Sequence, residues 1–399
     1  MNDILIFALL FVAIAIGWLM GKRSAPRVPA GPELPSQYYK GLNYLLDGRP
    51  DGAIDAFINA LEVNSETLET HVALGNLLRK KGEVDRAIRI HQNLLARPSL
   101  PRSQVHQAHL ELARDYISAG LLDRAERLLL DLVEESPEQR RASQRHLLEI
   151  YQNEREWEQA IEVAIALLPR KSLLSTGIEP VQGQPVAVAL AHYYCEMACD
   201  KRDQGDLAAA RNFIQQALTH DKRCVRASLL LGEVEFDRGN YKLAVKALRK
   251  VRQQDPEYVS ETIPLLRQCY SEMQDDRTLK TYLQDCLLTD PSAPLVLAVA
   301  EDLRVSEGDK IAGEFLSTQL ADRPSLRGLE RLIGLQLDTS DPGARESLSL
   351  LQLLVERLVA ERATYRCGHC GFAGQQLHWY CPGCKYWGTV KTIRGTRLE

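Results

Sequence analysis

The sequence predicts an all-α fold in which repeated pairs of helices stack into a superhelix. Three observations lead to this prediction: an apolar run before residue 21, a 34-residue periodicity in the middle of the chain, and two Cys-x-x-Cys pairs near its end. The chain has 399 residues, 45% of them hydrophobic, which is enough to bury several small cores. Its net charge of −4 lacks the basic excess of nucleic-acid-binding proteins, so no nucleic-acid partner is expected.

Residues 1–21 predict a single-pass transmembrane anchor. The stretch from Ile4 to Met20, ILIFALLFVAIAIGWLM, is apolar over 17 residues, close to the minimum that crosses a bilayer. Lys22 and Arg23 follow it directly, so the positive-inside rule places the bulk of the chain on the cytoplasmic side. A cleavable signal peptide would carry its basic residues before the apolar run, so we expect the anchor to be retained.

A Pro- and Gly-rich stretch over residues 22–35 predicts a juxtamembrane linker. From residue 36 a pattern of small residues recurs with a period of 34. Small residues let two helices approach closely, and a glycine in the turn between them accepts a positive φ. The clearest copies of the pattern contain Gly41, Gly48 and Ala53; Gly75, Gly82 and Ala87; Gly205, Ala210 and Ala217; Gly239, Ala244 and Val251.

This pattern resembles the tetratricopeptide repeat, whose stacked helix pairs present a curved inner surface to other proteins. We expect an N-terminal block of repeats over 36–168 and a C-terminal block over 187–340, whose last copies are degenerate. Between the blocks, PRKSLLSTGIEPVQGQPV at 169–186 predicts a hinge loop because it is rich in proline and glycine.

Residues 341–364 predict a helix that connects the repeats to the C-terminal module. Asp341 and Pro342 form a typical N-terminal signature for it. Four leucines form a stripe on this helix, and we expect the stripe to pack onto the repeats or onto the module. These are Leu350, Leu351, Leu354 and Leu358.

The register of the repeats also indicates which side chains face the inner groove of the N-terminal block. These partner-binding candidates are Asn76, Arg79, Lys80, Leu110, Arg114 and Ile117. A polar, positive surface of this kind would suit a carboxylate or an acidic segment, although ordinary solvated residues would give the same pattern. In the fifth repeat, Cys195 and Cys199 lie one helical turn apart, which fits either two buried packing cysteines or a pair of metal ligands.

No catalytic residues are predicted. The sequence has no phosphate-binding Gly-x-x-x-x-Gly-Lys loop, no His-Glu-x-x-His metalloprotease motif and no Gly-x-Ser-x-Gly elbow. The expected activity is therefore binding, and the protein is not expected to be an enzyme.

The stretch 365–399 predicts a metal-binding module. Its ligands would be the four thiols of Cys367, Cys370, Cys381 and Cys384, arranged as two Cys-x-x-Cys pairs with ten residues between them. Nine cysteines, an odd number, favour a reducing compartment, and a thioredoxin-like redox pair would need a βαβ context that is absent here. Gly371 and Gly383 would let backbone amides point at the sulfurs, and His369 and His378 are not needed because four thiolates already complete a tetrahedron.

The two turns, CGHCG and CPGCK, resemble the knuckles of rubredoxin and zinc-ribbon modules. All four ligands come from the protein, so the ion has no open position for a substrate and its role is structural. A tetrathiolate site accepts iron or zinc, and both remain open.

Taken together, the anchor, the repeats and the four cysteines resemble the lipopolysaccharide assembly protein B family over the whole chain. The resemblance implies a non-enzymatic adaptor in the bacterial inner membrane. It would promote proteolysis of the deacetylase that commits precursor to lipid A, using the membrane AAA+ zinc protease. It would also answer to an inner-membrane lipopolysaccharide sensor protein through its anchor region.

Two other functions stay open. One is a general membrane-tethered scaffold that coordinates lipopolysaccharide synthesis and export proteins. The other is electron transfer through a rubredoxin-type iron, which is less favoured because the rest of the chain carries no cofactor motif. Whether the protein forms a homo-oligomer is also left open.

Overall fold

The computed structural model describes residues 11–18, 36–47, 49, 52–53, 56, 68–96, 100–169, 183–289, 291–339 and 341–393. Of the predicted anchor, residues 11–18 are described and are helical. Within the described ranges, no helix combines the length and the apolar character required to cross a membrane. The predicted linker at 22–35 and residues 170–182 of the predicted hinge loop lie outside the described residues.

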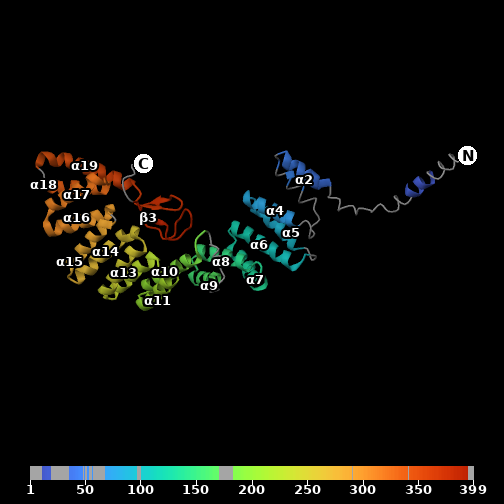
Figure 1. The fold of residues 1–399 in the computed structure, drawn as a ribbon, viewed down its shortest axis with the longest axis horizontal. Coiled ribbons are helices and arrows are strands. Elements are labelled where there is room, and N and C mark those ends of the chain that lie inside the picture. The colour runs from blue at the N-terminus through green and yellow to red at the C-terminus, as the bar shows by residue number, and fades with distance from the viewer. Residues whose placement is uncertain are drawn as a thin grey trace. The chain divides into compact units, whose positions relative to one another are not determined.

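The chain divides into two compact units, Met1–Gln139 and Arg140–Glu399. In the first unit, helices that follow one another in sequence pack together, from α4 through α7 (Figure 1). Its described helices are α2 (Ser36–Leu46), α4 (Leu68–Lys80), α5 (Val84–Leu95), α6 (Arg102–Ser118) and α7 (Leu122–Glu135).

The second unit is also built of paired helices, and within it the helices stack in chain order (Figure 1). The first of them are α8 (Arg140–Glu154), α9 (Trp157–Leu167), α10 (Val186–Asp203), α11 (Leu207–His220), α12 (Val225–Asp237) and α13 (Tyr241–Gln254). The short helix η1 (Pro256–Tyr258) leads into α14 (Val259–Glu272), α15 (Asp276–Thr289), α16 (Ala293–Glu307), α17 (Asp309–Asp322), α18 (Leu326–Thr339) and α19 (Pro342–Glu361).

The glycines of the repeat pattern have the roles that the sequence predicts. Gly82, Gly205 and Gly239 lie in turns between paired helices with φ of 83°, 81° and 76°, a conformation that strains other residues. Gly232 lies inside α12 against α13, where a Cβ atom would come within 2.6 Å of the Leu248 side chain. Close packing of the paired helices therefore requires glycine at this position.

Helix α19 differs from the prediction. It packs against α18 through a face that includes the buried Val355. The predicted leucine stripe lies on the other side of the helix and is exposed, so the expectation that it packs onto the repeats or the module was wrong. The exposed fractions are 60% for Leu350, 49% for Leu351, 46% for Leu354 and 47% for Leu358.

The C-terminal module is a small antiparallel sheet of order β2-β1-β3. Its strands are β1 (Tyr365–Cys367), β2 (Ala373–Gly374) and β3 (Val390–Thr392). Tyr365 pairs with Gly374 on one side and with Thr392 on the other. The module's own core is very small, with Cys367, Cys381 and Val390 as its buried members. A segment with so little apolar core needs another source of stability.

Candidate metal centre

Two similar backbone turns position the four cysteines. Strand β1 ends at Cys367, and the chain turns so that the amide of Gly371 donates to the carbonyl of Cys367 at 3.0 Å. The second turn repeats this geometry, with the amide of Lys385 donating to the carbonyl of Cys381 at 2.9 Å.

Each turn closes with one residue in the left-handed region, Gly371 at φ 79° and Lys385 at φ 62°. Glycine was expected to ease both turns, but in the second turn Lys385 adopts the left-handed conformation. Gly383 is required for a different reason, because a Cβ atom there would lie only 3.2 Å from Sγ of Cys370. This glycine lets the two turns approach each other.

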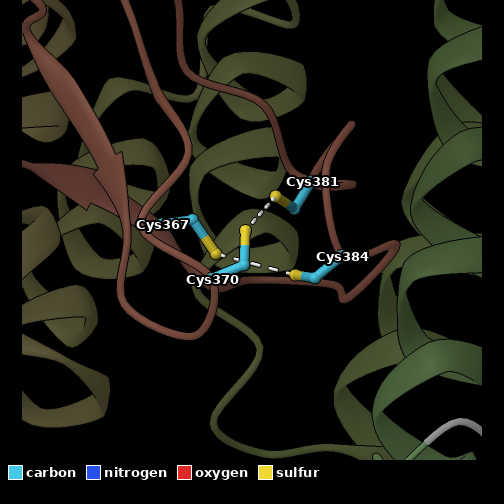
Figure 2. Close-up of side chains that lie close together, drawn as sticks. All are labelled: Cys367, Cys370, Cys381 and Cys384. Carbon is cyan, nitrogen blue, oxygen red and sulfur yellow. Dashed lines mark hydrogen bonds between the residues drawn. The ribbon is translucent and has the colours of Figure 1, made fainter.

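The four sulfur atoms point toward one common centre (Figure 2). All four lie within 4.8 Å of one another, and the Cys367–Cys384 and Cys370–Cys381 sulfur pairs are each 3.7 Å apart. A tetrahedron with metal–sulfur bonds of about 2.3 Å has sulfur–sulfur edges of about 3.8 Å. The donor set therefore fits one tetrathiolate-bound ion, either iron or zinc.

The protein surroundings favour negative charge on one of these sulfurs in particular. Burial opposes ionisation of Cys367, but hydrogen bonds from Thr389 and from the amides of Cys370 and His369 outweigh it and lower its pKa to about 6. Oγ1 of Thr389 lies 3.2 Å from Sγ of Cys367, within reach to donate its proton to a thiolate. At Cys384, in contrast, burial raises the pKa to about 12.

The two histidines near the cysteines lie outside the sulfur cluster. The ring of His369 stacks on Tyr386 with a centroid distance of 4.0 Å, and the ring of His378 packs edge-on against Phe372 at 5.9 Å. In the part of the chain that the structure describes, only the four cysteines group three or more potential metal ligands within bonding range.

An aromatic cluster attaches the module to α9 and α10. Trp387 of the module is 3% exposed. Its ring stacks on His192 at 4.9 Å and contacts Tyr193 and Trp157 edge-on at 5.9 and 6.3 Å. Trp379, on the same face of the module, stacks on Tyr258 at 5.4 Å. The apolar surface that the module does not bury by itself is thus buried against the repeats.

A hydrogen-bonded amide lies at the centre of this contact. Oε1 of Gln152, on α8, accepts from the Tyr193 hydroxyl at 2.7 Å and from Nε1 of Trp387 at 3.0 Å. Nε2 of the same side chain donates to the Tyr380 hydroxyl at 2.7 Å. One buried glutamine therefore provides a hydrogen-bond partner for three aromatic side chains, Tyr193 of α10 and Tyr380 and Trp387 of the module.

A second set of polar contacts holds strand β3 against the start of α14. The Tyr258 hydroxyl donates to the carbonyls of Val390 and Gly388 at 2.8 and 3.1 Å. Nζ of Lys391 lies 2.7 Å from a carboxylate oxygen of Asp255 and 2.5 Å from one of Glu257. The module is therefore attached along two of its edges.

These docking residues were not predicted from the sequence. One signal was available, because two of the four tryptophans of the chain, Trp379 and Trp387, lie eight positions apart in the module. A three-stranded sheet of this size cannot bury two tryptophans alone, so their presence indicates a partner surface.

Known proteins resemble the chain in both parts. Residues 70–105 and 195–259 match families described as "Tetratricopeptide repeat", and residues 365–392 match the family described as "Rubredoxin metal binding domain". The curated protein "Lipopolysaccharide assembly protein B" of Escherichia coli (strain K12) is 37% identical over 394 residues, which is 98% of each chain. The protein of the same name from Haemophilus influenzae is 34% identical over 400 residues, again 98% of each chain.

The chain belongs to the lipopolysaccharide assembly protein B family. Solved structures are less similar. "Crystal structure of MamA protein" has 19% identity and a TM-score of 0.31, and covers 49% of this chain and 95% of that one. "Structure of Naa15/Naa10 bound to HypK-THB" has 14% identity and a TM-score of 0.41, and covers 77% of this chain and 47% of that one. Neither likeness is high enough to support a conclusion about this family member.

In this family member, the predicted groove residues lie in the first unit within a network of ion pairs. Nη1 of Arg79 lies 2.7 Å from Asp115, and its Nη2 lies 2.9 Å from Glu111 and 2.6 Å from Oδ1 of Asn76. Nη1 of Arg114 lies 2.6 Å from the other oxygen of Glu111. The two arginines are thus paired with the carboxylates of Glu111 and Asp115 on α6.

The remaining groove candidates differ in exposure. Leu110 is buried at 4% exposure and belongs to the packing of α6, whereas Ile117 is half-buried and Lys80 is exposed. In the second unit, Cys195 is fully buried and Cys199 is half-buried beside Arg226, whose Nη2 lies 3.8 Å from its sulfur. That pair therefore has the packing role rather than a role in a described metal cluster.

Proposed function

We propose that the protein is a membrane-anchored, non-enzymatic adaptor that limits lipopolysaccharide synthesis. In this proposal it promotes proteolysis of the lipid A-committing deacetylase by the membrane AAA+ zinc protease. The full-length similarity to proteins named for lipopolysaccharide assembly supports this assignment, as do repeats of a type that binds other proteins.

The anchor at residues 1–21 would hold the chain in the bacterial inner membrane, with its bulk in the cytoplasm and an inner-membrane lipopolysaccharide sensor acting through the anchor region. Tethering raises the effective concentration of adaptor, protease and substrate relative to one another. Asn76, Lys80 and Ile117, which are at least partly exposed, remain candidates for partner contact in the first unit.

The docked metal module is the observation that supports an adaptor most directly. Cys367, Cys370, Cys381 and Cys384 would hold one iron or zinc ion with all four positions filled by protein, so the ion stabilises a fold instead of binding a substrate. The module in turn joins α8, α10 and the start of α14 through Gln152, Trp387 and Tyr258. Metal binding would therefore stabilise the repeat surface that partners recognise.

The metal assignment can be tested on the purified full-length chain. We expect one equivalent of iron or zinc per chain, and removal of the ion by a strong chelator should lower the unfolding temperature of the second unit. Tryptophan fluorescence should report the change, because Trp157, Trp379 and Trp387 all lie in the contact between module and repeats. Unfolding that is identical before and after chelation would rule out a stabilising ion.

The adaptor assignment can be tested by measuring the half-life of the deacetylase in cells. The double substitution Cys367→Ser/Cys370→Ser should lengthen that half-life, whereas Cys199→Ser, at a half-buried cysteine outside the centre, should leave it unchanged. Normal turnover in the double variant would exclude the proposed role of the metal module.

A general scaffold for lipopolysaccharide synthesis and export proteins is the second candidate, favoured by the word "assembly" in the name of the relatives. Crosslinking in native membranes separates the two proposals. Recovery of the protease with the deacetylase supports the adaptor, and recovery of transport proteins without the protease supports the scaffold.

A further inference from the structure

The exposed leucines of α19 form a continuous apolar face on the last helix of the repeat stack. Leu350, Leu354 and Leu358 recur every four residues and therefore form one ridge along the helix, with Leu351 beside it and Leu353 on its other side. Between 46% and 60% of each of these five side chains is exposed. The opposite face of α19, through Val355, already packs against α18.

An apolar outer face is unexpected at this position. The terminal repeat of a helical stack normally carries a polar outer face, because no further repeat follows to cover it. Five half-exposed leucines within nine residues make a larger apolar patch than scattered surface leucines do. The face is therefore typical of a surface that another molecule covers.

The charges beside the ridge indicate which molecule this is. Glu346 and Arg357 lie eleven residues apart, which is about three helical turns, so both lie on the same flank of α19. Both are exposed, and within the described ranges neither makes an ion pair. In an antiparallel pair of identical helices, each flank faces the same flank of its partner. Glu346 of the first copy therefore meets Arg357 of the second, and Arg357 of the first meets Glu346 of the second.

The same register brings part of the leucine ridge together. Its two-fold axis passes between Leu351 and Gln352, so Leu350 of one helix lies beside Leu354 of the other, whereas Leu358 lies opposite Arg345. A lipid surface fits less well, because interfacial helices carry a polar face rich in lysine and arginine. The polar positions of α19 carry both signs, including Glu356, Arg357 and Glu361.

We propose that the α19 face is a self-association surface, on which two copies of the chain pair antiparallel through the leucine ridge and two Glu346–Arg357 ion pairs. This inference does not depend on the proposed adaptor function. It assigns a role to the leucines that the intramolecular fold leaves uncovered.

Sedimentation velocity of the full-length chain over a concentration series tests this proposal. A non-ionic detergent keeps the apolar N-terminal stretch from causing association by itself. We expect a dimer, and Leu354→Glu should raise its dissociation constant by at least about 100-fold, because a charge replaces the side chain that packs beside Leu350 of the second copy. The matched control is Leu288→Glu on α15, where a leucine that is 86% exposed should tolerate the same change without effect.

A charge exchange identifies the second copy as the partner. Glu346→Arg alone and Arg357→Glu alone each place like charges at both contacts and should weaken the dimer at least about tenfold. An equimolar mixture of these two variants should associate as tightly as the unmodified chain, because every contact in the mixed dimer then joins a cation to a carboxylate.

Three results would overturn the proposal. The chain could remain monomeric throughout the series, or dimerise with the same affinity after Leu354→Glu. The third is a mixture of the charge variants that associates no better than either variant alone. Binding of the monomer to lipid vesicles through Leu354 would likewise replace the second copy with a membrane and exclude the proposal.

Discussion

Gln184 and Trp387 exchange two hydrogen bonds across 203 residues of sequence. Nε2 of Gln184 donates to the carbonyl of Trp387, and the amide of Trp387 donates to Oε1 of Gln184, both at 2.9 Å. The side chain thus pairs with the backbone of the module much as a neighbouring strand would. Because Gln184 lies just before α10, the module contacts the described end of the predicted hinge loop at 169–186.

Gly183 makes this contact possible and gives the first prediction. Its φ is 82°, and a Cβ atom there would lie 2.0 Å from the Tyr386 hydroxyl, whose ring is held by stacking on His369. Gly183→Ala should therefore reduce the free energy of unfolding by about 2 kcal/mol or more, from backbone strain and the clash together.

Gly205→Ala is the control for backbone strain alone. Gly205 has nearly the same φ, 81°, but no atom lies within 4 Å of the added Cβ, so we expect a loss of about 1 kcal/mol. Chemical denaturation followed by tryptophan fluorescence measures both variants, and equal losses would contradict the contact with Tyr386.

Removal of the buried amide of Gln152 is the second prediction. Gln152→Ala leaves the Tyr193 hydroxyl, the Trp387 indole and the Tyr380 hydroxyl without this shared partner, and we expect a loss of about 2–4 kcal/mol in the free energy of unfolding. Gln253→Ala on the exposed face of α13 should change it by less than about 0.5 kcal/mol. Denaturant titration of the two variants provides the comparison.

The third prediction concerns metal affinity. The Thr389 hydroxyl lies 3.2 Å from Sγ of Cys367, and partners of this kind are worth about 10–100-fold in metal affinity. Thr389→Val should weaken Zn²⁺ binding by that factor in competition with a chromophoric chelator, and Thr389→Ser should restore it. Thr392→Val, three residues later in strand β3 but facing Glu261, should have no effect.

The fourth prediction is a pH dependence of stability. Burial, and then the positive charge of Arg226, hold the pKa of His192 well below its usual range. The unfolded chain therefore binds a proton at His192 more tightly than the folded chain. The stability contributed by neutral His192 is fully present above about pH 6.5 and is lost progressively as the pH falls below that value.

His192→Phe keeps an aromatic ring against Trp387 and removes the titration. The variant should lose less stability than the unmodified chain between pH 6.5 and pH 5 in thermal melts at constant ionic strength. Protonation of the thiolates affects both proteins alike, so the difference between them isolates His192. Parallel stability curves would show that His192 does not contribute.

Local patterns were enough to predict the repeats and the cysteine centre. Glycine is needed wherever a turn takes a positive φ, as at Gly82, and wherever a helix comes close to its neighbour, as at Gly232, so the period appears directly in the sequence. The two Cys-x-x-Cys turns each fix a pair of sulfurs through hydrogen bonds within five residues. Both features depend on neighbours in the chain.

Other features depend on residues far away in sequence. From the sequence, Arg79 is expected to be an exposed cation in the groove. In the fold it pairs with Glu111 and Asp115, which lie more than 30 positions later in the chain. From the sequence, Leu350 and Leu354 are expected to lie on the packing face of α19, but α18 covers the face that carries Val355. A helix with apolar residues on two sides does not reveal by itself which side the fold will bury.

The sequence alone determined the helix-pair repeats and the four-sulfur cluster, because spacing within one or two turns of the chain decides both. Only the tertiary structure decided where the C-terminal module docks, which charges are neutralised and which leucines stay uncovered. Those outcomes depend on pairings between residues 30 to 235 positions apart, as between Gln152 and Trp387, and the local pattern of one element does not encode its distant partner.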